Sequence, residues 1–116
     1  MNDTIAAVST APAPGGIGIV RISGENAREV ADRIFRAKSR KSVKNAAGYT
    51  ALYGYIYENG EMVDEAIALV FAAPKSYTGE DVVELSCHGG MLVTRSVLRL
   101  ALSAGARLAE AGEFFE

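Results

Sequence analysis

The sequence contains only one cysteine and one histidine, Cys87 and His88, among its 116 residues. A lone thiol cannot form an internal disulfide, and one thiol with one imidazole cannot build a zinc site, so a reducing compartment fits best. The N-terminus carries Asp3 and no basic residue, which argues against a signal peptide. No apolar run approaches the roughly 18 residues that a membrane span requires. We therefore expect a soluble, cytoplasmic protein with no membrane partner and no metal.

Excess positive charge is also missing, because the net charge is -2 and the isoelectric point is near 5.4. A dedicated nucleic-acid-binding domain usually carries a strong positive field, so any RNA contact must come from a local patch or from another domain. The segment RAKSRKSVK, from Arg36 to Lys44, holds five basic residues and no acid. It either contacts RNA phosphates or forms a solvated loop, and the sequence leaves both possibilities open.

Phosphate-binding loops are absent. The segment GGIGIVRISG places Arg21 where the dinucleotide motif G-x-G-x-x-G needs glycine, and its glycines precede a predicted strand rather than a helix. The motif G-x-x-x-x-G-K-[ST] does not occur. We therefore interpret Gly15, Gly16 and Gly18 as a tight turn with close backbone approach.

The patterning that is present predicts one domain, residues 1–116. Strands are predicted over residues 4–10, 17–23, 49–57, 62–73, 81–88 and 106–112, and helices over residues 24–37 and 91–104. Asn59-Gly60 is typical of a hairpin turn, and Asn26 with Glu29 resembles a capping box. The order β-β-α-β-β-β-α-β favours an α+β fold, a mixed β-sheet with two helices packed on one face.

Two charged residues occupy strands where aliphatic residues are expected. Arg21 shares a strand face with Ile17 and Ile19, and Glu84 stands between Val83 and Leu85. Each side chain either faces water or must be paired or line a cleft. A guanidinium suits a carboxylate, and a carboxylate suits the paired N–H groups of an amino-pyrimidine ring. In the second interpretation, Arg21 and Glu84 are complementary ends of one pocket.

The segment SYTGEDVVELSCHGG gathers further polar groups. His88 is a candidate general base, but no nucleophile is spaced to complete a triad with it, so a structural role before the second helix is favoured. Cys87 is expected in the core and inert. Tyr77 and Thr78 belong to a loop that either satisfies its own backbone or lines a pocket, where Tyr77 would stack on an aromatic ligand. His88 is a third possible pocket-lining residue. A hydrolase or transferase built on His88 and Asp81 remains as an alternative.

Three segments, TIAAVSTAPAPGGIGIVRISG, PKSYTGEDVVELSCHGG and ARLAEAGEF, resemble the N-terminal domains of the MnmE (also TrmE) family of tRNA-modifying GTPases. The match covers nearly the whole chain in order and spacing. Two positions depart from it. Ala111 stands where the family has proline, and Phe115 and Glu116 replace the residues that usually follow GEF.

The resemblance implies a fold similar to the tetrahydrofolate-binding domain of the glycine-cleavage aminomethyltransferase. It also implies binding of 5-formyltetrahydrofolate or a related one-carbon folate, homodimerisation, and action with the flavoprotein MnmG on carbon 5 of the wobble uridine of tRNA. The family's folate contacts correspond to Arg21 and Glu84, and a third, a lysine, falls beyond the last residue.

The resemblance further implies that this chain is a fragment. The helical domain and the G domain, which would hold GTP, magnesium and potassium, are not part of it. We therefore expect no GTP hydrolysis and no catalytic residue here. The alternative is a purely structural dimerisation scaffold that binds no ligand.

Overall fold

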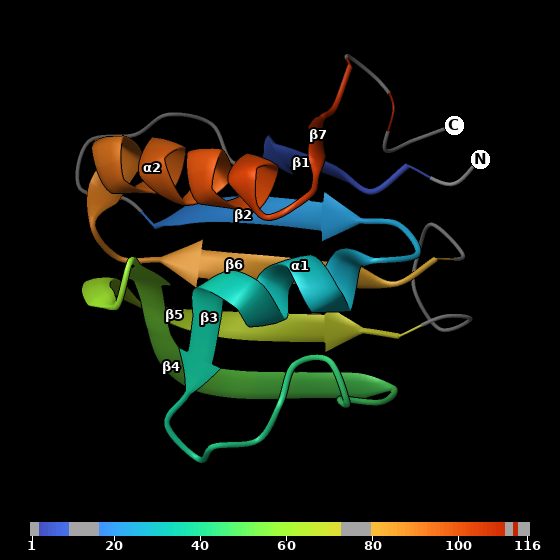
Figure 1. Ribbon diagram of the computed structural model, residues 1–116, viewed down its shortest axis with the longest axis horizontal. Helices are drawn as coiled ribbons and strands as arrows, with labels where there is room; N and C mark the ends of the chain where they lie inside the picture. The colour runs from blue at the N-terminus through green and yellow to red at the C-terminus, as the bar shows by residue number, and fades with distance from the viewer. Residues whose placement is uncertain (1–2, 10–16, 73–79, 111–112, 114–116) are drawn as a thin grey trace.

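The computed structural model describes residues 3–9, 17–72, 80–110 and 113, and in these ranges it shows one sheet and two helices (Figure 1). The predicted α+β class is confirmed. The elements in chain order are β1 (Ile5–Val8), β2 (Gly18–Ser23), α1 (Ala27–Ile34), β3 (Phe35–Ala37), β4 (Tyr49–Glu58), β5 (Glu61–Phe71), β6 (Val82–Cys87), α2 (Gly90–Ser103) and β7 (Arg107–Leu108).

The seven strands form a mixed sheet in the order β3-β4-β5-β6-β2-β1-β7. All pairs are antiparallel except β1 with β7, which is parallel. The predicted turn between β4 and β5 is confirmed, because Asn59 and Gly60 both have positive φ, 51° and 83°, as a type I′ turn requires. Strand β6 inserts between β5 and β2, and this insertion joins the two halves of the sheet.

Both helices lie on one face of the sheet, as the sequence predicts, and they stand in front of the strands in Figure 1. The apolar core fills the space between the helices and this face. Gly18 permits α2 to approach β2 closely, because a Cβ at this position would lie 1.9 Å from Oγ1 of Thr94. The close backbone approach inferred from the glycines is therefore found at Gly18.

Three details differ from the sequence predictions. Phe35 ends α1 and begins β3, a strand that was not predicted, and β3 pairs with β4 beside Gly54. A Cβ at Gly54 would lie 2.1 Å from the carbonyl oxygen of Arg36, so glycine is what allows the pairing to be this close. Asn26 makes no side-chain capping bond, so the capping box is wrong; instead its N–H donates to Oγ1 of the buried Thr4. The final strand is shorter than predicted, only Arg107–Leu108.

Neither helix in the described ranges is long and apolar enough to cross a membrane.

Candidate functional site

The candidate site lies on the face of the sheet opposite the helices. Alternation in β2 and β6 directs Val20, Leu85 and Cys87 into the core, where all three are fully buried. The residues between them point to the other, helix-free face. Arg21 and Glu84 are the charged members of this set, so their placement follows from strand period alone.

Arg21 and Glu84 are directly opposite each other in the register of β2 and β6. Nε of Arg21 donates to Oε2 of Glu84 at 2.8 Å, and the two side chains are 20% and 12% exposed. The sequence suggested two ends of one pocket. The structure instead brings the two charged groups into contact across β2 and β6. We call this pair, Arg21 and Glu84, the polar strip. Each charge is thereby compensated, which a half-buried position requires.

The surroundings of the pair are mostly apolar. Across the sheet, Ala7 lies opposite Arg21 on β1, and Leu69 lies opposite Glu84 on β5. The next row of the same face contains Ile19, Ser86 and Ile67, which are cross-strand partners. A flat ligand lying on this face would meet aliphatic side chains around one cation and one anion.

His88 follows the last residue of β6, and its contacts connect this end of the strand to β5. Its backbone N–H and that of Gly89 donate to Oδ2 of Asp64, at 2.7 and 3.0 Å, just before α2 begins. Its ring Nδ1 lies 3.2 Å from the carbonyl oxygen of Glu65. Asp64 thus anchors the start of α2 to β5. No local pattern indicates this role, because the contact spans 24 residues and depends on strand pairing.

Asp81 is placed far from His88 along the sheet. It precedes β6 while His88 follows it, and a strand rises roughly 3.3 Å per residue, so these residues are about 20 Å apart. Oδ2 of Asp81 accepts from Nε of Arg28 at 2.9 Å, which ties the start of β6 to α1. Asp81 therefore forms an ion pair with Arg28, and the structure does not bring His88 and Asp81 together as a catalytic pair.

Cys87 is buried in the core, as predicted. Burial, with a smaller contribution from the charge of Asp64, raises the pKa of the Cys87 thiol to about 12. Because the thiolate is the nucleophilic form, this residue is inert near neutral pH.

Several predicted positions fall outside the described residues. These are the proposed pocket-lining residues Tyr77 and Thr78, the turn residues Gly15 and Gly16, and the departures from the family pattern at Ala111, Phe115 and Glu116. Among the residues that are described, no cluster of three or more histidine, cysteine, aspartate or glutamate side chains is arranged to hold a metal ion.

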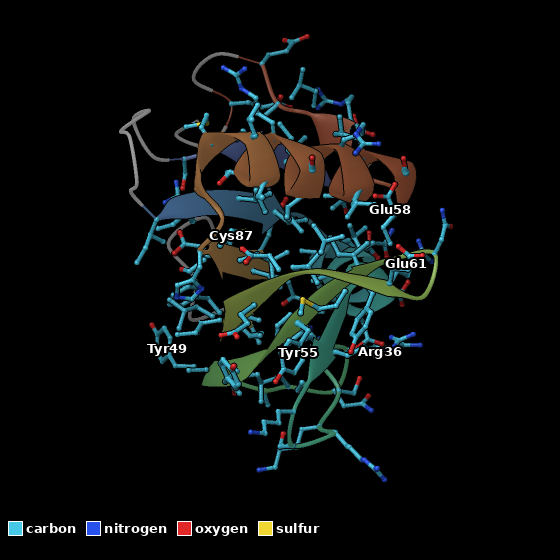
Figure 2. All side chains as sticks on the ribbon, turned by 90° about the vertical axis from the view of Figure 1, so that its left-hand side faces the viewer. Arg36, Tyr49, Tyr55, Glu58, Glu61 and Cys87 are labelled. Carbon is cyan, nitrogen blue, oxygen red and sulfur yellow. The ribbon has the colours of Figure 1, made fainter. Side chains whose placement is uncertain are left out.

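The basic segment from Arg36 to Lys44 runs along β3 and the loop after it. With Arg33 and the β4–β5 turn, it borders a hollow of about 680 Å³. This region lies apart from the ion pair, because β4 and β5 separate β3 from β6 in the sheet. In Figure 2, Arg36 is labelled to the right of the molecule's centre and Tyr49 on its left.

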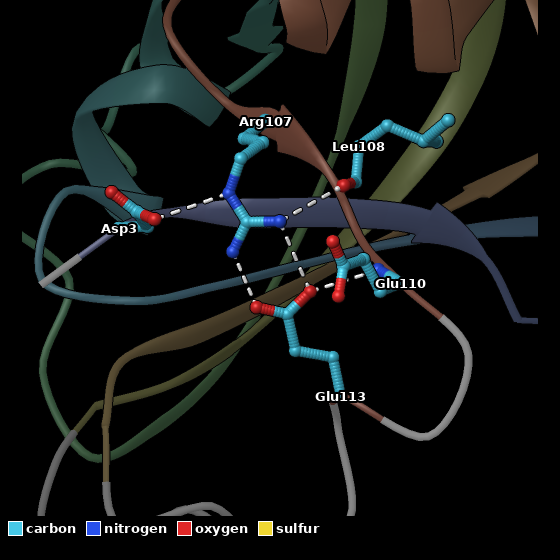
Figure 3. A network of polar contacts seen from close by, with 5 residues as sticks. All are labelled: Asp3, Arg107, Leu108, Glu110 and Glu113. Carbon is cyan, nitrogen blue, oxygen red and sulfur yellow. Dashed lines mark hydrogen bonds and ion pairs between the residues drawn. The ribbon is translucent and has the colours of Figure 1, made fainter.

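The two ends of the described chain are joined by Arg107 (Figure 3). Its Nε donates to Oδ2 of Asp3 at 3.1 Å, and its guanidinium forms two bonds with Glu113. The bond to Arg107 lowers the pKa of the Glu113 carboxyl, and the same bond raises the pKa of Arg107. All three side chains are well exposed or partly so, and the contact positions β7 beside β1.

The fold and the polar strip define a small α+β domain with one helix-free sheet face. Comparison of the sequence with known families identifies residues 4–116 as matching the family described as "GTP-binding protein TrmE N-terminus". The chain belongs to this family, which confirms the resemblance noted in the sequence.

The curated relatives carry the name tRNA modification GTPase MnmE. The protein from Symbiobacterium thermophilum is 56% identical over 97% of this chain, and those from Geobacter sulfurreducens and Clostridioides difficile are 53% and 51% identical over 98% of it. In each case the chain spans 25% of the relative's length.

Proposed function

We propose that this chain is the folate-binding and dimerisation domain of a tRNA-modifying GTPase, which acts with the flavoprotein MnmG at carbon 5 of the wobble uridine. The observation that carries the folate proposal is the half-buried pair of Arg21 and Glu84 on the helix-free face. The ligand is 5-formyltetrahydrofolate or a related one-carbon folate. The domain itself performs no catalysis.

The contact between the two charges suits the edge of a pterin ring. That edge carries adjacent N–H donors and a carbonyl acceptor. The carboxylate of Glu84 accepts from the N–H groups, and the guanidinium of Arg21 donates to the carbonyl. Since the two side chains are held together at 2.8 Å, one ring edge reaches both. The aliphatic neighbours Leu69 and Ile19 then contact the flat part of the ring.

Calorimetric titration of 5-formyltetrahydrofolate into the full-length protein tests this proposal. Arg21→Ala and Glu84→Ala should each weaken binding by roughly tenfold or more, since a hydrogen bond to a charged group contributes about 1.5–3 kcal/mol. The matched control is Arg28→Ala, which breaks a similar ion pair, at 2.9 Å to Asp81, outside the polar strip. Unchanged affinity in both Arg21→Ala and Glu84→Ala overturns the proposal.

Dimerisation is supported by apolar side chains on the helix-free face. Tyr49, Tyr53 and Ile67 are 66%, 42% and 38% exposed, and they come from the neighbouring strands β4 and β5. Contiguous exposed apolar residues of this kind mark interaction surfaces. We assign this patch to contact with a second copy of the chain.

Light scattering distinguishes this interface from a solvated face. Ile67→Glu should convert the dimer to monomer, because it buries an unpaired charge in the interface. The control is Leu92→Glu on α2, where the replaced residue is 80% exposed. If the Ile67→Glu variant remains dimeric, this patch is not the dimer interface.

A separate measurement tests the alternative of a scaffold without ligand. A dimer whose melting temperature does not change when folate is added favours that alternative.

A further inference from the structure

A hollow beside β3, the edge strand of the sheet, concentrates positive charge. It lies between the end of α1, strand β3, the loop after it and the β4–β5 turn, and its volume is about 680 Å³. We call it the basic cleft and define it by Arg33, Arg36, Arg40 and Lys41, with Asp32 and Tyr57 also on its wall.

The charge of the basic cleft is opposite to that of the whole chain. Its wall carries four cations and one carboxylate, a balance of +3, whereas the net charge of the sequence is -2. The one carboxylate is engaged locally, because Oδ1 of Asp32 accepts from Oγ of Ser42 and from the N–H of Val43, each at 3.2 Å. Within the described ranges, no carboxylate lies at ion-pair distance from Arg36, Arg40 or Lys41.

The loop that carries these cations is held in shape by its own hydrogen bonds. The N–H of Arg40 donates to the carbonyl of Ala37 at 3.0 Å, and the N–H of Lys41 donates to Oγ of Ser39 at 3.3 Å. Nη1 of Arg36 donates to the main-chain oxygen of Asp32 at 3.1 Å. Arg40 adopts a positive φ of 67°, which is uncommon for a residue with a side chain. The cations are therefore presented by a defined loop.

Two of the cations have a partial structural explanation, and two do not. Arg33 lies in the last turn of α1, where a cation interacts favourably with the helix dipole. Its guanidinium also donates to the carbonyl of Ala104 at the end of α2. Arg36 is fixed to Asp32. Arg40 and Lys41 make no side-chain contact of this kind in the described ranges, so both charges are available to a ligand.

The geometry points to the basic cleft as a binding site for the phosphodiester backbone of single-stranded RNA, such as the loop of a tRNA hairpin. This inference rests on the proposed function in tRNA modification. Arginine presents a planar fork of donors that suits phosphate oxygens, and clustered cations give affinity through release of counterions. Tyr57 adds an aromatic wall on which an unpaired base can stack. Proteins that bind single strands usually combine a positively charged groove, which follows the phosphate backbone, with aromatic side chains on which the bases stack.

Fluorescence anisotropy with the full-length protein and a labelled RNA hairpin of anticodon-arm sequence tests this site. The cleft variant is Arg40→Gln with Lys41→Gln. The matched control is Lys38→Gln with Lys44→Gln, which removes the same charge from the same loop at positions that do not line the cleft. All four side chains are exposed, so both variants should fold.

The cleft variant should bind the hairpin roughly tenfold more weakly and lower the slope of log affinity against log salt by about 2, whereas the control should stay within about twofold. Tyr57→Leu should weaken binding several-fold with no change in the salt slope, and Tyr57→Phe should retain it. Equal losses of affinity in the two double variants overturn the proposal, because they would show that only the total charge of the loop, and not its placement in the cleft, affects binding. Binding of phosphatidylserine vesicles in place of the hairpin also overturns it.

Failure of this inference is distinguishable from failure of the proposed function. Folate titration depends on Arg21 and Glu84 and is measured without RNA. If the protein binds folate normally but its affinity for the hairpin does not change when Arg40 and Lys41 are replaced, the proposed function stands and the RNA-binding role of the basic cleft is rejected.

Discussion

The two faces of the sheet use the same strands for different purposes. On the helix-covered face, Val20 and Leu85 are fully buried in a continuous apolar core. One residue away on each strand, Arg21 and Glu84 form a half-buried ion pair among partly exposed neighbours. Packing on the core face stabilises the fold, and the other face has polar groups that a ligand can bind. Substitutions one residue apart should therefore have separable effects.

The largest contrast is expected in thiol reactivity. The native Cys87 thiol, with its pKa raised to about 12 by burial, should react with a disulfide reagent at pH 8 roughly a thousandfold more slowly than an ordinary thiol. Ser86→Cys in a Cys87→Ala background places the thiol one residue away on the helix-free face and should react rapidly. Stopped-flow absorbance measures both rates. Equal rates would show that the two faces are not distinct in solution.

The same raised pKa gives a pH dependence of stability. Above about pH 8.5 the unfolded chain loses the Cys87 proton while the folded chain keeps it until about pH 12. The stabilising contribution is complete below pH 8.5 and is lost as the pH rises through this window. Cys87→Ala should remove that slope in urea titrations at a series of pH values.

A second contrast concerns packing. Leu85→Ala, on the core face, should lower the free energy of unfolding by about 2–5 kcal/mol, because it removes a fully buried side chain and leaves a cavity. Ile67→Ala, on the helix-free face, removes a side chain that is 38% exposed and should cost about 1 kcal/mol or less in the monomer. Urea unfolding at low protein concentration compares the two. Similar losses would mean that the helix-free face is packed against something in the folded state.

The ion pair offers a sharper test, because stability and binding should respond differently. Arg21→Met alone leaves the Glu84 carboxylate half-buried without this partner and should cost about 1–3 kcal/mol of stability. Adding Glu84→Leu should restore most of that loss, since an apolar pair of similar volume needs no compensation. Folate binding, measured by calorimetry, should be lost in both variants. Recovery of binding in the double variant would remove the pair from the proposed site.

The smallest effect is expected at the exposed contact between the chain ends. The bond to Arg107 holds the pKa of the Glu113 carboxyl below its usual range, so its contribution to stability is present above about pH 4.3 and is lost as the pH falls. Arg107→Gln should raise the pKa of Glu113 towards its ordinary value, with the backbone hydrogen bond from Glu110 still lowering it, as NMR titration of the side-chain carbon will show. A change in stability at pH 7 should be barely measurable, because exposed ion pairs contribute little.

Local patterns determined a large part of this molecule. Alternation with a period of two assigned Val83, Leu85 and Cys87 to the core and Glu84 to the other face, and the structure agrees. Asn59-Gly60 determined the hairpin, because that dipeptide adopts positive φ at little cost. Segment β3 was missed, since its three residues continue the apolar pattern of α1 and only pairing with β4 makes them a strand.

Only the tertiary structure decided which groups meet. Arg21 and Glu84 are 63 residues apart, and Asp64 reaches the start of α2 across 24 residues. No local periodicity encodes these contacts, because they arise from the insertion of β6 between β5 and β2. By itself the sequence determined the family and the face on which each side chain lies, since both depend on residue order. Which charges become neighbours depends on strand order and register, and these are set by packing of the whole chain.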